Sequence, residues 1–240
     1  MTAARRRALL LILAGVAIVG ALALFAARPS APKATVEKPR LLLLLTSLPL
    51  VFGEGFGLEV GGSPAFKALS ERFTVLPIST TAPAELRKGP LLLMAHPPAQ
   101  TAENLVALDQ WVRDGGRVLL LADPSLEWPS DRPLGDPLRP PPMFMDTGLL
   151  KHWGLRLESA EQRGPQMRRL AGREVMTASP GSLSGSCEIS ADRLTAQCRI
   201  GRGRATIVAD ADLLDVEHLD GPTENNLEAV LAELANLSAR

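Results

Sequence analysis

The sequence contains no tyrosine, and aromatic residues make up only 4% of its 240 residues. Carbohydrate sites are usually rich in rings on which sugars stack, so this scarcity disfavours a carbohydrate-binding protein. Lysine and arginine together number 26 and balance 26 acidic residues, so no surplus of basic residues indicates a nucleic-acid-binding surface. The composition therefore argues against both nucleic acids and sugars as ligands.

Several catalytic motifs are also missing. No serine stands in the Gly-x-Ser-x-Gly pattern that exposes a nucleophile, and neither Gly-x-Gly-x-x-Gly nor a Walker sequence occurs. Gly53, Gly55 and Gly57 lie close together, but they lack the helix start and the lysine that a phosphate-binding loop needs. The sequence gives no signature of a serine hydrolase or of a nucleotide-binding enzyme.

An apolar amino-terminal segment is the first feature that is present. Arg5, Arg6 and Arg7 precede an uncharged run over 8–27, which is about 30 Å long as a helix and spans a bilayer. The arginines favour the cytoplasm, which predicts a single-pass protein of a bacterial inner membrane with its carboxyl-terminal domain in the periplasm. A cleaved signal peptide is the alternative, although the run exceeds the usual ~7–15-residue signal core. We expect residues 1–27 to be the anchor and 28–39, rich in Pro and Ala, a linker.

Residues 40–240 alternate between buried apolar runs and amphipathic segments. Strands are expected at 41–45, 74–78, 91–95, 118–121, 155–157 and 204–208, and helices after Pro64, at 101–114, at 146–153 and from Thr223. Residues 159–172 show no clear pattern. This alternation predicts an α/β, Rossmann-like layered domain with a mainly parallel sheet and a small β-hairpin insertion at about 173–201.

The stretch from Thr101 to Pro124 gives the clearest local signals. Thr101 can cap a helix whose first turn carries Glu103, where the helix dipole favours an anion. Gly115 and Gly116 end that helix, and the following run, apolar on both faces, is typical of an inner strand of a parallel sheet. We therefore expect a helix, a tight turn and a buried strand in succession.

Polar residues follow several of the predicted strands. Asp123, Asp210 and Asp212 come after two of them, and Glu54 lies in the loop after the first strand. Ligands of open α/β sheets bind at the carboxyl ends of the strands, so these side chains are candidate binding residues. Clustered carboxylates suit Mg²⁺ or Ca²⁺, whereas aspartates at strand ends also cap helices or brace loops. We expect no cofactor and keep a metal held by the three aspartates as the alternative.

Two further residues complete the candidate site. His96 ends the third strand, where it is either a general base or ligand, or a loop residue that makes one hydrogen bond. Trp128 lies in a proline-rich loop at 124–142 and is a candidate hydrophobic contact for a partner. Loops of such length are often functional.

The only two cysteines are Cys187 and Cys198. Facing strands of a hairpin would bring them together, and in an oxidising compartment we expect a disulfide. Two buried free thiols are the alternative. A metal site is less favoured, because no second cysteine pair or nearby histidine completes a ligand set.

Three segments, ALDQWVRDGGRVLLLADP, LLKHWGLRLE and VADADLL, resemble the periplasmic region of auxiliary proteins of GldG-type (gliding-motility-like) ABC transporters. The similarity covers roughly 91–214. It implies a fold related to class I glutamine amidotransferases, held beside a transporter in the membrane. The amidotransferase cysteine would follow the strand that here ends at Met94 and Ala95, and His96-Pro97-Pro98 stands there instead. The resemblance thus implies a protein without that activity.

Together these features predict a non-catalytic, membrane-anchored periplasmic accessory protein. Its partner would be an ABC-type membrane complex, permease and ATPase, or another envelope protein. The alternative is a metal-assisted hydrolase of an envelope substrate, with Asp123, Asp210 and Asp212 as ligands and His96 as base.

Overall fold

A computed structural model of the chain describes residues 40–52, 62–133 and 135–239. The predicted anchor at 8–27, the linker at 28–39 and Glu54 lie outside these residues, so they remain predictions. Across the described ranges, no helix has both the length and the apolar character needed to cross a bilayer.

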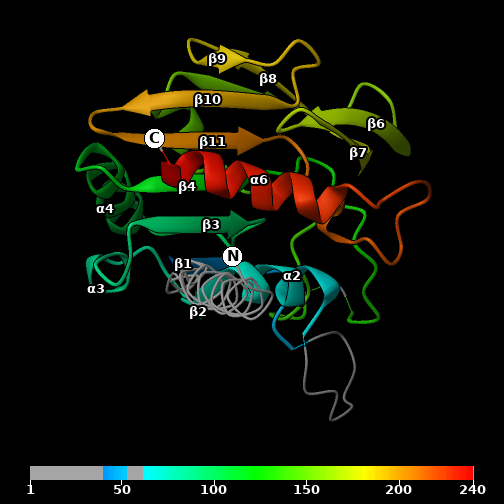
Figure 1. The fold of residues 1–240 in the computed structure, drawn as a ribbon, viewed down its shortest axis with the longest axis horizontal. Helices are drawn as coiled ribbons and strands as arrows, with labels where there is room; N and C mark the ends of the chain where they lie inside the picture. Colours follow the sequence, from blue (N-terminus) through cyan, green and yellow to red (C-terminus); the bar gives the residue numbers. More distant parts are fainter. Residues whose placement is uncertain (1–39, 53–61, 134, 240) are drawn as a thin grey trace, which may run out of the picture. The chain divides into compact units, whose positions relative to one another are not determined.

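A seven-stranded sheet in the order β2-β1-β3-β4-β11-β10-β9 forms the centre of the domain (Figure 1). Neighbouring strands from β2 to β11 run parallel, whereas β10 and β9 are antiparallel additions at one edge. The predicted α/β class with a mainly parallel sheet is therefore confirmed. The strands are β1 Arg40–Thr46, β2 Phe73–Pro77, β3 Leu91–Ala95, β4 Arg117–Leu121, β9 Glu188–Ile189, β10 Thr195–Ile200 and β11 Gly203–Val208.

Helices cover both faces of this sheet. Residues of α2 and α6 belong to one hydrophobic core, and residues of α3, α4 and α5 belong to the core on the opposite face. The inner strands are consequently buried on both sides, which explains their uninterrupted leucine runs. The helices are α2 Pro64–Arg72, α3 Pro83–Leu86, α4 Ala102–Arg113, α5 Leu149–His152 and α6 Asn226–Ala239, with a 3₁₀ turn η1 at Asp212–Leu214.

The helix, turn and strand expected from Thr101 onward are present as α4 and β4. The Thr101 hydroxyl accepts a hydrogen bond from the Asn104 amide at 3.3 Å and caps the helix. Gly115 has a φ of 116°, in the left-handed region that favours glycine. A Cβ at Gly116 would collide with the ring of Trp111, so the helix and strand can approach this closely only with glycine there.

The segment expected as a hairpin insertion at about 173–201 is more elaborate. β5 (Leu155–Glu158) pairs with β8 (Ser182–Gly185), and β6 (Pro165–Leu170) pairs with β7 (Arg173–Ala178), each pair forming a separate two-stranded sheet. β9 and β10 instead extend the central sheet. The insertion thus consists of the β5–β8 and β6–β7 ribbons and of the strands β9 and β10 at the edge of the central sheet. It begins before residue 173.

Two helix boundaries also differ from expectation. α5 begins at Leu149 and not at Asp146, because the Asp146 carboxylate accepts hydrogen bonds from the amides of Gly148 and Leu150 and forms a turn ahead of the helix. α6 begins at Asn226 and not at Thr223, whose carbonyl accepts the Asn226 amide in a preceding turn.

Candidate functional site at the carboxyl edge of the sheet

Three aspartates meet where β4 and β11 end, and we call them the aspartate cluster: Asp123, Asp210 and Asp212. One residue, Ala122, separates Asp123 from the end of β4, and Asp210 and Asp212 follow β11. One potential ligand atom of each lies within 4.8 Å of those of the other two, and all three residues are buried. The convergence expected from the sequence is therefore present, because β4 and β11 are parallel neighbours.

Asp123 joins the loops that follow the two strands. Its Oδ1 accepts the amide of Ser125 at 2.8 Å, and its Oδ2 accepts the amide of Ala211 at 2.8 Å. The first bond closes a turn after β4, and the second crosses to the chain after β11. Asp123 thus fixes the two strand ends relative to each other.

Asp210 makes a similar pair of contacts. Its Oδ1 accepts the amide of Leu213 at 2.8 Å and holds the turn η1, while its Oδ2 accepts the amide of Ala178 at 3.1 Å. The second bond connects the main sheet to the β6–β7 ribbon. The brace role that strand-end aspartates often play is therefore present at Asp123 and Asp210.

Asp212 differs from the other two. Its Oδ2 accepts the amide of Glu127 at 2.8 Å, which holds the proline-rich loop after β4. Its Oδ1 is buried and has no hydrogen-bond partner among the described residues, although the residue is only 2% exposed. A buried carboxylate oxygen without a partner is costly, and it distinguishes Asp212 from Asp123 and Asp210, whose oxygens all accept backbone amides.

Burial dominates the electrostatics of the cluster. Desolvation raises the pKa of Asp123 to about 6, despite the backbone amides that favour its charged form. Desolvation and the nearby charge of Asp123 raise the pKa of Asp212 to about 8. The pKa of Asp210 is raised well above its usual range by desolvation and then by the charges of Asp123 and Asp212. In the absence of a cation, the cluster therefore holds protons at neutral pH.

His96 lies at the same edge, directly after β3, but it is completely buried. Its Nε2 lies 2.9 Å from the carbonyl oxygen of Pro141, which requires a hydrogen on Nε2. Desolvation lowers the pKa of His96, so the ring is neutral and Nδ1 carries no hydrogen. Its φ of 45° lies in the left-handed region. The structure thus places His96 as the loop residue that makes one hydrogen bond and not at a surface accessible to substrate.

Trp128 is partly buried and packs against the core on the α2–α6 face. It therefore contributes to packing of the loop and does not project as a free contact. Large apolar side chains that are exposed between β4 and α5, among the described residues, are Leu138, Met143 and Met145.

A small pocket that the sequence did not predict adjoins the cluster. It has a volume of about 90 Å³, and its lining residues include Asp212, Glu127, Asp215, His218 and Asp220. The Asp215 carboxylate lies 2.7 Å from Nδ1 of His218. Three of these carboxylates belong to the run DLLDVEHLD over 212–220. The turn η1 helps to bring them to the wall of the pocket, and no periodic pattern in the sequence predicts that turn.

Ser179 is a second residue that the sequence did not indicate. It is buried, its φ is 48°, and its hydroxyl donates a hydrogen bond to the Glu127 carboxylate. The hydroxyl also accepts the amide of Gly164 at 2.8 Å. Ser179 therefore ties the loop after β4 to the ends of the β6–β7 ribbon.

Cys187 and Cys198 form a disulfide, which confirms the expected pairing. Cys198 lies on β10, and Cys187 directly precedes β9, so the bond fastens the edge of the sheet. Neither sulfur is a free thiol.

Comparison with models of known protein families and with curated proteins gives no match. Solved structures share the fold. The exo-β-1,4-mannosidase Op5Man5 from Opitutaceae bacterium strain TAV5 superposes with a TM-score of 0.50 at 13% identity, over 84% of this chain and 36% of the enzyme. Gan42B, a GH42 β-galactosidase from G. stearothermophilus, gives a TM-score of 0.50 at 12% identity, over 84% of this chain and 30% of the enzyme.

The mmIFT52 N-terminal domain is similar over almost its whole length. Its TM-score is 0.51 at 13% identity, and the match covers 81% of this chain and 97% of that domain. The present chain spans only about a third of the two glycosidases. At these identities the likeness shows a shared α/β fold and nothing about activity.

Proposed function

We propose that this chain is a non-catalytic accessory protein, anchored in a bacterial inner membrane, that binds a component of an ABC-type transport system from the periplasmic side. The observation that carries the proposal is the loop 124–148, which covers the carboxyl edge and presents three apolar side chains to solvent. Leu138 is 67% exposed, and Met143 and Met145 are each 51% exposed. Their position in one short segment supports a protein contact there.

The loop is held firmly by the domain beneath it. The amide of Phe144 donates to the carbonyl of Asp123 at 2.6 Å, and the amide of Leu126 donates to that of Pro142 at 3.0 Å. The ring of His96 holds the carbonyl of Pro141. A loop fixed before binding loses little conformational entropy on association, and methionine adapts well to a partner surface.

The polar groups at this edge support a binding role over catalysis. Five of the six carboxylate oxygens of the aspartate cluster accept backbone amides, so they serve to hold loops. The two cysteines are bonded to each other and offer no thiolate nucleophile. The disulfide also supports an oxidising compartment such as the periplasm.

The test is a crosslinked pull-down of the full-length protein from its native membrane, read by mass spectrometry. We compare the wild type with a triple variant, L138S/M143S/M145S, and with V106S. Val106 is 70% exposed on α4, outside the loop, and is the matched control. Recovery of a permease and its ATPase with the wild type and V106S, and their loss with the triple variant, would support the proposal.

Thermal unfolding of all three proteins must show equal midpoints, since the substituted side chains are exposed. Equal recovery of the transporter with the triple variant would remove the loop from the interface. Absence of transporter subunits from every sample would overturn the accessory role itself.

The second candidate function is a metal-assisted hydrolase of an envelope substrate. The spacing of the three carboxylates favours it, since such clusters bind Mg²⁺ or Ca²⁺. The burial of His96 weakens it, because that base has no access to a substrate. Turnover of a chromogenic ester or phosphate that requires added metal and is lost in D210N would establish this activity. No metal-dependent turnover would eliminate it.

A further inference from the structure

The aspartate cluster contains three buried carboxylates and has no cationic partner among the described residues. None of the ion pairs found among the described residues involves Asp123, Asp210 or Asp212. Buried carboxylates are normally paired with a cation, protonated or bound to a metal. The cluster therefore requires either protons or a cation to be stable.

The orphan oxygen of Asp212 indicates where a cation would bind. Asp212 Oδ1 is buried without a partner, and Asp212 also lines the acidic pocket beside the cluster. The other carboxylates lining that pocket are Glu127, Asp215 and Asp220. Its lining among the described residues includes no lysine or arginine, and His218 in that lining lies 2.7 Å from Asp215. The pocket is thus mainly acidic, and Asp212, the residue with the unpartnered oxygen, forms part of its wall.

The spacing of the three side chains suits a large hard cation. Three atoms within 4.8 Å of one another share a centre no farther than about 2.8 Å from each. A shift of a few tenths of an ångström brings all three into the Ca²⁺–oxygen range of about 2.3–2.6 Å. The oxygens that already accept a backbone amide keep a second lone pair for coordination.

We infer that the aspartate cluster binds one hard divalent cation of the Ca²⁺ class, with Asp212 as the central ligand. The cation joins the chain after β4 to the chain after β11, two segments already connected by the bond from the Ala211 amide to Asp123. Its role is structural, and the inference does not depend on the proposed partner. The pull-down tests the transporter partner and the metal measurement tests the cation site. Either proposal can therefore fail while the other holds.

The test uses the full-length protein in detergent, treated with EDTA and dialysed. Bound metal is measured by mass spectrometry after equilibration with Ca²⁺ or Mg²⁺, and the unfolding midpoint is measured with and without each ion. We expect one Ca²⁺ per chain and a midpoint rise of about 3–6 °C at tenfold excess over Kd. A larger response to Ca²⁺ than to Mg²⁺ supports the Ca²⁺ class.

Two variants test the ligand assignment. In D212N the amide oxygen can still accept the Glu127 amide, so the fold is preserved while the charged ligand is lost. D131N makes the same change at an exposed residue of the same loop and is the matched control. We expect the Ca²⁺ response to disappear in D212N and to persist in D131N.

The metal content and unfolding midpoint of the wild type test the cation site even if D212N does not fold. Absence of bound metal and an unchanged midpoint with both ions would overturn the inference and leave protons as the occupants of the cluster. A response that persists in a folded D212N would also overturn it, by moving the cation elsewhere.

Discussion

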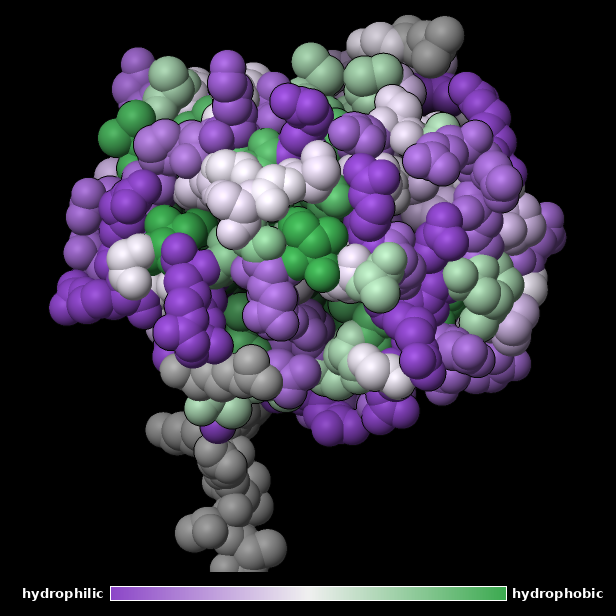
Figure 2. Space-filling model, turned by 90° about the horizontal axis from the view of Figure 1, so that it is seen from above, coloured by the Kyte–Doolittle hydropathy of each residue, from purple (hydrophilic) through white to green (hydrophobic). Residues whose placement is uncertain are grey.

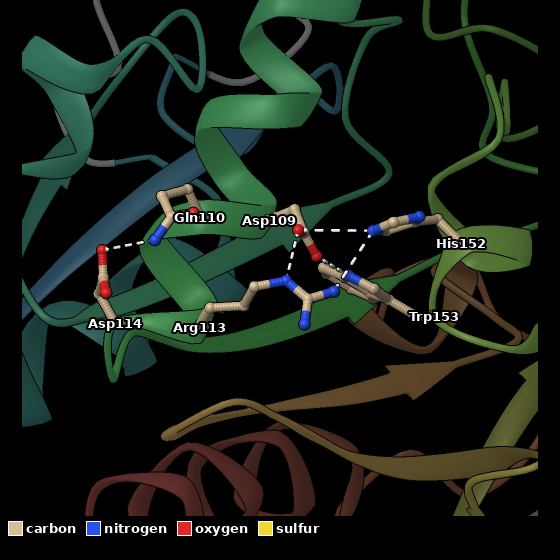
Figure 3. Close-up of polar contacts among 6 residues, drawn as sticks. All are labelled: Asp109, Gln110, Arg113, Asp114, His152 and Trp153. Carbon is tan, nitrogen blue, oxygen red and sulfur yellow. Dashed lines mark hydrogen bonds and ion pairs between the residues drawn. The ribbon is translucent and has the colours of Figure 1, made fainter.

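Asp109 on α4 accepts a hydrogen bond from the indole nitrogen of Trp153, with 2.9 Å between Asp109 Oδ1 and Trp153 Nε1 (Figure 3). The other oxygen of Asp109 contacts Arg113 at 2.7 Å and His152 at 3.4 Å. Trp153 is only 6% exposed, so its N–H has lost access to water. This contact fastens α4 to the end of α5 on one face of the sheet.

Replacing Asp109 by alanine should lower the free energy of unfolding by about 1–3 kcal/mol, because a buried N–H is left without an acceptor. The control is R113A, which removes an exposed ion-pair partner and should cost less than about 1 kcal/mol. Urea unfolding of both variants gives the comparison. Equal losses of unfolding free energy in D109A and R113A would show that the bond to the indole nitrogen contributes little to stability.

Asn226, at the start of α6, should be equally sensitive. Its side-chain amide donates to the carbonyls of Met176 and Leu213 at 2.8 and 2.9 Å, and its oxygen accepts the amide of Met176 at 2.9 Å. N226A should cost about 3 kcal/mol or more, since several buried groups lose their partners. The neighbouring Asn225 is exposed and precedes the helix as its N-cap residue, so N225A should cost only about 1 kcal/mol. Thermal or urea unfolding of the pair tests this, and similar values for both would contradict it.

The disulfide should stabilise the edge of the sheet. Cys187 and Cys198 are 11 residues apart, and closing a loop of that length stabilises the folded state by about 2–3 kcal/mol in the chain-entropy model. A C187S/C198S variant should lose about that amount in urea unfolding. Dithiothreitol should lower the stability of the wild type and leave that of the variant unchanged. A wild type insensitive to reductant would refute a stabilising role.

Stability should also depend on pH through the aspartate cluster. The folded state retains a proton on Asp212 up to about pH 8, whereas an unfolded carboxyl loses it near pH 4. The folded state thus binds more protons, and the free energy of unfolding falls as the pH rises, by up to about 1.4 kcal/mol per pH unit. The charges that face Asp212 are those of Asp123, Glu127 and Asp215, and all three oppose ionisation.

The useful window for this measurement is pH 6.5–8 in EDTA. The lowered pKa of His96 has the opposite effect on stability, but it acts below about pH 6.5. Urea unfolding at four pH values should show a declining stability for the wild type and a shallower decline for D212N. A flat wild-type profile would contradict the expected proton retention.

The sequence predicted those parts of the fold that periodic patterns specify. The leucine runs of β1, β3 and β4 and the cap at Thr101 depend on local preferences, and each lies where it was expected. Strands of a parallel sheet end at a common edge, so Asp123 and Asp210 could be assigned to one edge from the sequence, whereas the pairing of β4 with β11 that brings them together could not.

The features that sequence reasoning missed depend on distant contacts. β6 alternates between exposed and partly buried positions and contains Gln166, Arg168 and Arg169, so it has almost no apolar signal and is stabilised by its pairing with β7. The acidic pocket needs the turn η1 to bring Asp212 and Asp215 beside Glu127. Trp128 is partly buried and packs against the core, a contact between its loop and distant residues that the sequence did not indicate.

The surface above β8 and β9 is mostly hydrophilic, with hydrophobic residues in small separate groups (Figure 2). A β-sheet edge can recruit other strands, and the two-residue length of β9 limits that tendency.

Arg40, which begins β1, and Ser238, in the last turn of α6, line one pocket together with Leu91 and Arg117. The described domain therefore starts and finishes at the same edge of the sheet, opposite the edge with the aspartate cluster. A short peptide could join residue 239 to residue 40, and new termini could then be opened in an exposed loop, giving a circular permutant. Because Arg40 and Ser238 lie at the same edge, the domain can also be inserted into a surface loop of a host protein while the two ends of that loop stay close together.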